Sequence, residues 1–304
     1  MPASKKAPKK THQSAAFVQL VSHISFKNIY MRWQEIFYDD GEAYARNPQF
    51  NWVYDKLNLT RAQGVACSPV GVNPTNYPVC VKPITNLFGL SRDAHYIGNA
   101  DDYDDYLLEE RPSGQFWMPF VGGEQYSVDL VFSRGKVVFT DTFRCVASER
   151  VFGLPQVHIH EDGYALPERT VSFLEKKLRR YTGPANVEII GGVVIEMHLR
   201  WSAENYMWRR RTEFVRMLPL WLGQRRTIPA VAEDVVYVPC FVDRDADVVA
   251  CQDVLARYGG DRFKVYLDEV EGDHQQHYAR LGVFVAGQDD VQEINLIKSR
   301  NNWV

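Results

Sequence analysis

The sequence contains no run of apolar residues long enough to cross a membrane as a helix, which needs about 20 such residues in succession. It also has no CxxC spacing among its five cysteines, which are few and scattered along 304 residues. An odd, dispersed set of cysteines is typical of reduced thiols rather than of a disulfide framework or a zinc site. We therefore expect a cytoplasmic protein with no membrane association.

An excess of basic charge is also missing. The chain has 35 basic and 38 acidic residues and a net charge of −3, so it lacks the surplus that binding many nucleic-acid phosphates requires. Residues 1–14 are the exception, with four lysines and no large apolar side chain. We predict a flexible basic tail there, serving either as a solubilising segment or as a tether to nucleic acid.

Internal repeats are absent, and helical and strand patterns are mixed along the chain, which predicts an α+β fold. We expect a short N-terminal region (15–50), a main domain (51–224) and, after a linker at 224–229, a small C-terminal α+β module (229–304). Helices are predicted at 54–64, 167–181, 247–258 and 289–299; strands at 79–84, 125–132, 136–141, 187–190, 193–199, 234–242, 262–270 and 278–286.

Two lysines stand in unusual settings. Lys56 begins a predicted helix, and Lys82 lies in the β-branched run Val79–Ile84. A lysine buried in such a strand is costly unless its ammonium group meets a negative partner. The alternative is an edge strand whose lysine points into solvent.

A predicted hairpin around Gly191-Gly192 carries several charged residues. Alternation along its second arm places Glu196, His198 and Arg200 on one face. With a two-residue turn, parity would put Glu188 of the first arm on the opposite face, so a bulge or a longer loop is required if both glutamates bind one metal. The alternative is a solvated face with a Glu–Arg pair.

In order and spacing, these features resemble the ATP-grasp superfamily, especially its carboxylate–amine ligase branch. The resemblance covers residues 50–210, and its motifs are Asp55-Lys56-Leu57, Val81-Lys82-Pro83, Phe116-Trp117-Met118-Pro119-Phe120-Val121 with Glu124, and Asn186-Val187-Glu188 with Ile195-Glu196-Met197-His198-Leu199-Arg200. It implies the ATP-grasp fold, in which two α+β subdomains grip a nucleotide. It also implies ATP and Mg²⁺ as cofactors, and small carboxylate and amine molecules as substrates.

The resemblance also implies a role for each matched residue. ATP would activate a carboxylate as an acyl phosphate, and an amine or another nucleophile would then attack it. Lys56 and Lys82 would contact the phosphates, Glu124 the ribose, and Met118, Phe120 and Val121 the adenine; Glu188, Glu196 and His198 would bind metal, and Arg200, with Lys82, would act in catalysis.

Three departures from the family pattern limit what the resemblance implies. His198 replaces the usual asparagine, which makes Mn²⁺ a possible metal beside Mg²⁺. The loop 85–92 has one glycine where several are usual, so Ser91 or Arg92 could take part in phosphate binding. The region before Lys56 is short, which implies a truncated N-terminal domain and leaves the substrate undefined.

Other interpretations stay open. An ATP-grasp kinase and a non-catalytic nucleotide-binding protein are alternatives to a ligase. His158-Ile159-His160 is interpreted as an exposed strand edge in preference to part of a substrate pocket or a metal site. Trp208-Arg209-Arg210-Arg211, with Arg216, is either a site for an anion or a solvated helix face, and residues 101–105 form an acidic surface segment.

Overall fold

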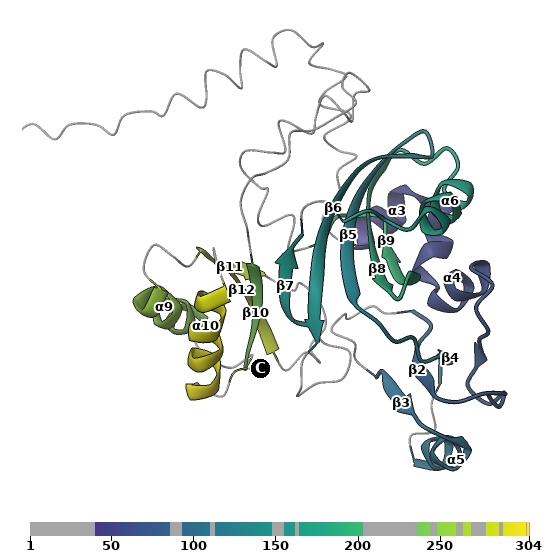
Figure 1. Ribbon diagram of the computed structural model, residues 1–304, viewed down its shortest axis with the longest axis horizontal. Helices are drawn as coiled ribbons and strands as arrows, with labels where there is room; N and C mark the ends of the chain where they lie inside the picture. Colours follow the sequence, from purple (N-terminus) through teal and green to yellow (C-terminus); the bar gives the residue numbers. More distant parts are fainter. Residues whose placement is uncertain are drawn as a thin grey trace, which may run out of the picture.

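A computed structural model describes residues 40–85, 93–109, 113–147, 155–161, 164–202, 236–243, 248–259, 264–268, 278–285, 288–301 and 303. The basic tail, the loop 86–92, the arginine cluster near 209 and the linker at 224–229 lie outside these residues. The described elements form two antiparallel sheets with helices packed on them (Figure 1), which confirms the α+β prediction.

The smaller sheet has four strands in the order β1-β4-β2-β3. Helix α5 (Ala100–Glu109) packs on it, with Tyr103 and Tyr106 buried one turn apart against the sheet while the acidic side chains face solvent. The acidic segment is therefore the outer face of a helix. The strands are β1 (Ser68–Pro69), β2 (Val79–Pro83), β3 (His95–Ile97) and β4 (Gln115–Pro119).

The larger sheet has eight strands in the order β11-β12-β10-β7-β6-β5-β8-β9. Strand β10 pairs with β7, Val236 opposite Ile159, so the C-terminal strands continue the same sheet. The bounds are β5 (Gln125–Ser133), β6 (Lys136–Ala147), β7 (Pro155–His160), β8 (Gly183–Ile190), β9 (Val193–His198), β10 (Val236–Asp243), β11 (Lys264–Asp268) and β12 (Tyr278–Val285).

One face of β5, β8 and β9 is apolar and forms the main core. Alternation turns Val128, Leu130 and Val187 into this core, so Ser127 and Asp129 occupy the opposite, polar face. The helical elements on the apolar side are α3 (Asp40–Arg46), η1 (Pro48–Tyr54), α4 (Lys56–Ala62) and α6 (Glu168–Lys177) (Figure 1).

A second core lies under the C-terminal helices α9 (Val248–Gly259) and α10 (Gln288–Arg300), which pack on β10 and β12. Val146 of β6 and Ile159 of β7 pack against this core. The C-terminal module therefore has its own core, but it also shares a sheet and a packing contact with the rest of the chain.

The hairpin predicted around Gly191-Gly192 is present and joins β8 to β9. Gly191 and Gly192 have φ angles of 54° and 80°, the positive pair that a two-residue hairpin turn of this kind requires. The register then shifts, so that Glu188 lies directly opposite Glu196 instead of diagonal to it. This is the bulge that a shared site for the two glutamates requires.

All five cysteines are free, as the sequence predicted. Of the described helices, none combines the length and apolar character needed to span a bilayer.

Candidate nucleotide and metal site

Lys82 lies inside the small sheet, because β2 is flanked by β4 and β3. Its side chain is buried, so the interpretation of a solvent-facing edge lysine is wrong. The ammonium group donates to the backbone oxygen of Ile195 in β9 at 3.0 Å and lies 5.7 Å from the centre of the Phe116 ring. Burial, followed by repulsion from Lys56, lowers the pKa of Lys82 to about 8. Its hydrogen-bond partner is a neutral carbonyl, which does not cancel the charge of the ammonium group. An anionic ligand could therefore bind favourably to Lys82.

Lys56 approaches the same hairpin from helix α4. Asp55 caps this helix by accepting from the amide of Asn58 at 2.8 Å, and the backbone amide of Lys56 donates to Ile84 at the end of β2. The Lys56 ammonium group is buried and lies 2.8 Å from a carboxylate oxygen of Glu196. Both predicted nucleotide lysines therefore converge on β9.

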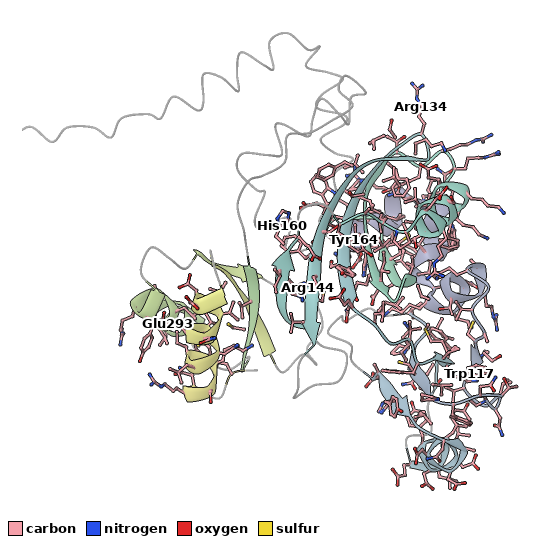
Figure 2. The ribbon with its side chains drawn as sticks, viewed as in Figure 1. Trp117, Arg134, Arg144, His160, Tyr164 and Glu293 are labelled. Atoms are coloured by element: carbon pink, nitrogen blue, oxygen red, sulfur yellow. The ribbon has the colours of Figure 1, made fainter. Side chains whose placement is uncertain are left out.

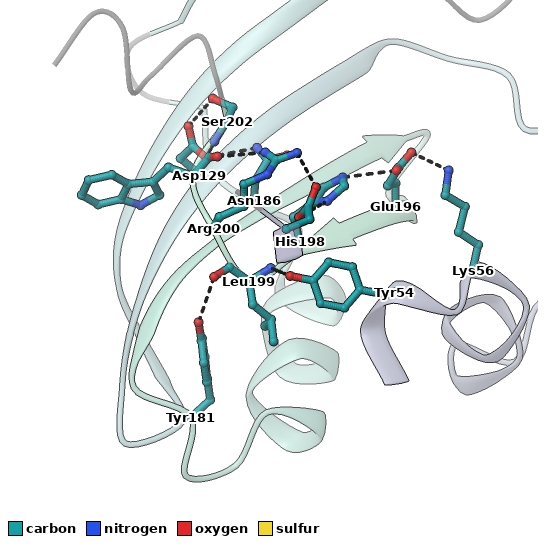
Figure 3. A network of polar contacts seen from close by, with 12 residues as sticks. Tyr54, Lys56, Asp129, Tyr181, Asn186, Glu196, His198, Leu199, Arg200 and Ser202 are labelled. Atoms are coloured by element: carbon teal, nitrogen blue, oxygen red, sulfur yellow. Dashed lines mark hydrogen bonds and ion pairs between the residues drawn. The ribbon is translucent and has the colours of Figure 1, made fainter. Parts of the chain in front are cut away.

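Glu196 bridges two cations (Figure 3). Its second carboxylate oxygen lies 3.2 Å from Nε2 of His198, while the first pairs with Lys56. Burial opposes ionisation, but Lys56 and His198 outweigh it and hold the pKa of Glu196 well below its usual range. Glu196 is thus an anion at neutral pH, as a ligand for a hard cation must be.

His198 lies between two carboxylates. Its Nδ1 is 2.9 Å from Asp40, and Nε2 faces Glu196. Burial disfavours the charged ring, but these carboxylates raise the pKa of His198 to about 9. Both carboxylates favour the protonated ring, and a protonated imidazole has two donor nitrogens and no lone pair for a metal.

Arg200 is paired with Asp40 at 3.0 Å, and its other terminal nitrogen donates to the backbone oxygen of Trp201 at 2.9 Å. The interpretation of a Glu–Arg pair on this face is therefore wrong: Glu196 pairs with Lys56 and His198. Asp40 carried no signal in the sequence, since its two partners lie 158 and 160 residues later.

A separate buried network fixes the chain just after β9 (Figure 3). Asp129 accepts from the backbone amide of Ser202 at 2.7 Å and from its hydroxyl at 2.6 Å. Asn186 donates to Asp129 and to Ser127. The asparagine of the N-x-E motif therefore supports the strands rather than facing a ligand.

The two hairpin glutamates fit a magnesium–nucleotide site. Residues directly opposite in an antiparallel pair have Cβ atoms about 4.5–5.5 Å apart, so both carboxylates can reach one ion. Mg²⁺ is commonly held by one or two carboxylates together with substrate phosphates. Within the described part of the chain no three His, Cys, Asp or Glu side chains form a metal-binding group, so the phosphates would have to complete the coordination.

The predicted adenine residues fall into two groups. Met118 is buried in an apolar cluster with Leu57 and Phe116, against which Val121 and Ile195 pack. Phe120 is instead 42% exposed and contacts the ring of Tyr96 edge-on at 5.0 Å.

Glu124, the predicted ribose ligand, is exposed and accepts from the hydroxyl of Tyr126 at 2.7 Å. The ring of Tyr126 stacks on Tyr164 with centroids 4.0 Å apart. The carboxylate of Glu124 is thus held at the start of β5, next to the Gly191-Gly192 turn whose first amide donates to the Glu124 backbone oxygen.

The two histidines of β7 are buried, because β7 lies between β6 and β10. The interpretation of an exposed strand edge is therefore wrong. His160 lies 2.8 Å from Asp141, and His158 lies 3.5 Å from the sulfur of Cys145. Figure 2 shows His160 on the large sheet.

No protein-family model and no curated protein matches the sequence. Solved structures do match. An L-amino acid ligase from Bacillus licheniformis aligns with a TM-score of 0.53 and 14% identity, over 83% of this chain and 71% of that one. An N5-carboxyaminoimidazole synthetase from Staphylococcus aureus, complexed with ADP, aligns with a TM-score of 0.57 and 13% identity, over 82% and 71%.

A third match, a carboxyaminoimidazole ribonucleotide synthase from Aspergillus clavatus complexed with ATP, gives a TM-score of 0.53 and 13% identity, over 80% of this chain and 71% of that one. These proteins are ATP-grasp enzymes, so the chain has the ATP-grasp fold. The fold prediction is thereby confirmed.

Proposed function

We propose that this chain is an ATP- and Mg²⁺-dependent ligase that joins a small carboxylate to an amine or a related nucleophile. The observation that carries the proposal is the convergence of two buried lysines on a hairpin whose two glutamates lie opposite each other. Such a site supplies cations for phosphates and carboxylates for a hard metal ion.

Phosphoryl transfer requires positioning and charge stabilisation from the protein more than covalent participation. Lys82 and Lys56 bind the phosphates, Glu188 and Glu196 hold the metal, and Arg200 stabilises charge on the transferred group. Mg²⁺, when bound, neutralises the phosphate oxygens. A carboxylate oxygen bonds to the γ-phosphorus as ADP leaves, and the nucleophile then bonds to the acyl carbon as phosphate leaves.

The nucleotide base would lie against the apolar cluster around Met118, with Val121 beside it and Phe120 at the exposed edge. Glu124 would accept from the ribose hydroxyl groups. A charged His198 would not ligate the metal. It would instead lie between the carboxylates of Asp40 and Glu196 and hold them in place.

The ligase proposal is favoured over a kinase by the names of the structural neighbours, which include an amino acid ligase and a synthetase. A non-catalytic nucleotide-binding protein remains the third candidate, and Arg200 beside the hairpin glutamates disfavours it. We propose a small-molecule carboxylate and a small-molecule amine as the two classes of substrate.

Two measurements test the proposal. Calorimetric titration with MgADP should show binding that the Lys82→Ala variant weakens by about 2–3 kcal/mol. ATP consumption should then be profiled against a panel of carboxylic acids and amines. A ligase yields ADP, phosphate and a coupled product, whereas a kinase leaves a stable phosphorylated product. Wild-type protein that binds no MgADP would refute the proposed function.

A further inference from the structure

Asp40 links the start of the described chain to the β8–β9 hairpin, which carries Glu188 and Glu196. It is the first residue of α3, and it faces His198 at the end of β9 and Arg200 just after that strand, about 160 residues further along the chain. One carboxylate oxygen lies 2.9 Å from Nδ1 of His198, and the other accepts from Arg200 at 3.0 Å. A single side chain therefore contacts two neighbouring cations, each with a different oxygen.

Those two cations would repel each other without Asp40. His198 and Arg200 are two residues apart on one face, so the imidazole and the guanidinium group are neighbours. Asp40 lies against both, 2.9 Å from Nδ1 of His198 and 3.0 Å from Arg200, so its carboxylate separates the two groups. The order of charges along this face is Lys56, Glu196, His198, Asp40, Arg200, which alternates in sign at every step.

Among the described residues, contacts at both terminal nitrogens hold the Arg200 guanidinium group. Asp40 accepts from one terminal nitrogen, and the backbone oxygen of Trp201 accepts from the other. The backbone of the same stretch is fixed independently, because the amide of Leu199 donates to the hydroxyl of Tyr54. Asp40 therefore holds one end of the Arg200 guanidinium group, while Tyr54 holds the backbone beside it.

We propose that Asp40 is a positioning residue for phosphoryl transfer, which holds Arg200 and His198 in place and touches no substrate itself. This inference rests on the proposed function, in which Arg200 acts on the transferred group. It adds to the site a residue from α3, outside the hairpin and outside both sheets. Misplacing a catalytic group by about 1 Å can cost roughly 100-fold in rate, which is the scale of effect expected here.

The first test compares Asp40→Asn with the wild type in ATP consumption, using the best acid and nucleophile from the panel. We expect kcat to fall roughly 10- to 100-fold, while the Kd for MgADP changes by less than about twofold, because ADP lacks the group that Arg200 would contact. Asp40→Glu, which keeps the charge, should recover part of kcat. Glu42→Gln is the matched control: it removes an exposed ion pair with Arg46 in the same helix and should leave kcat unchanged.

The second test is a double-mutant cycle with Arg200→Lys. If Asp40 acts through Arg200, Asp40→Asn should cost much less in kcat in the Arg200→Lys background than in the wild type. Equal losses in both backgrounds, or a loss of MgADP affinity as large as the loss of kcat, would overturn the inference. If Asp40→Asn does not fold, Asp40→Glu alone enters the cycle. Failure of the proposed function is a different result, since the wild type itself would then bind no MgADP.

Discussion

At the scale of single residues, Lys82 combines burial with a neutral hydrogen-bond partner, and this combination is costly without a ligand. Lys82→Ala should weaken nucleotide binding by about 2–3 kcal/mol, because hydrogen bonds between charged groups and phosphate are the strong kind. Lys82→Met, which keeps the length of the side chain, should raise the melting temperature of the ligand-free protein, since it removes a buried charge.

Calorimetric titration with MgADP and thermal unfolding check both expectations. Lys136→Ala is the control, because that lysine is 71% exposed and pairs with Glu175 at the surface. Unchanged affinity in Lys82→Ala would remove this lysine from the site.

Glu196→Gln should abolish metal-dependent turnover, because an amide keeps the volume but removes the charge that binds a hard divalent cation. The structure adds a second expectation. The carboxylate of Glu196 is the ion-pair partner of the buried Lys56. Removing one partner of a buried ion pair typically costs about 3–5 kcal/mol of stability. The ligand-free variant should therefore melt lower than the wild type.

Turnover and melting temperature separate the two roles of Glu196. Glu188→Gln is the matched variant, since this glutamate lies opposite on β8, where Gln125 donates to it at 3.4 Å. It should lose turnover with a smaller loss of stability. Near-normal turnover in Glu196→Gln would exclude this residue as a metal ligand.

His198→Asn distinguishes a metal ligand from a structural cation. If the imidazolium only orders Asp40 and Glu196, the substitution should lower turnover by a similar factor with Mg²⁺ and with Mn²⁺. A ring that ligates the metal would instead make the wild type favour Mn²⁺, and the variant would shift towards Mg²⁺. Measuring ATP consumption with each metal decides between these outcomes.

At the scale of elements, the features that depend only on neighbouring residues could be predicted from the sequence. The turn at Gly191-Gly192 needs two positive φ angles, and the alternation along β9 follows from the pleat, so both could be predicted from neighbouring residues. The sequence predicted the bulge only on the condition that Glu188 and Glu196 share one metal. Alternation of side chains along each strand does not determine the register in which the two strands pair. Helix α5 was missed because its acidic residues dominate the composition, although Tyr103 and Tyr106 have helical spacing.

Contacts between distant segments could not be predicted in this way. Nothing near Asp40 in the sequence indicates a partner about 160 residues away. The burial of His158 and His160 depends on β10 pairing with β7, and that pairing joins two segments of the chain that were expected to be separate.

Strand β10 also determines what removal of the C-terminal module would do. Ending the chain at Gln224 would expose the edge of β7 and leave Val146 and Ile159 without the core that packs on them. Unpaired strand edges promote aggregation. We expect the shortened protein to bind MgADP but to melt lower and to scatter more light on heating. Loss of MgADP binding in a folded, shortened protein would show that residues 229–304 take part in the nucleotide site.

At the scale of the whole molecule, the residues of the proposed nucleotide site come from both sheets. Lys82 comes from the small sheet and donates to β9 of the large one, and Lys56 at the start of α4 pairs with the same strand. The apolar cluster around Met118 likewise includes Ile195 of β9. A ligand bound between these elements should therefore couple the two sheets, while α9 and α10 pack on a core of their own.

Hydrogen exchange can measure this coupling along the chain. Adding MgADP should slow exchange at the backbone amides of β2, β4, β8 and β9, because a ligand that binds only the folded site suppresses the openings that release it. The amides of α9 and α10 should change little. The Lys82→Ala variant, at the same MgADP concentration, should show no slowing in β2 or β9, which ties the effect to the site and excludes a general effect of the added salt. Slowing of equal size in α9 and α10 would contradict a site confined to the two sheets around β9, since it would mean that the C-terminal helices open together with the nucleotide-binding strands.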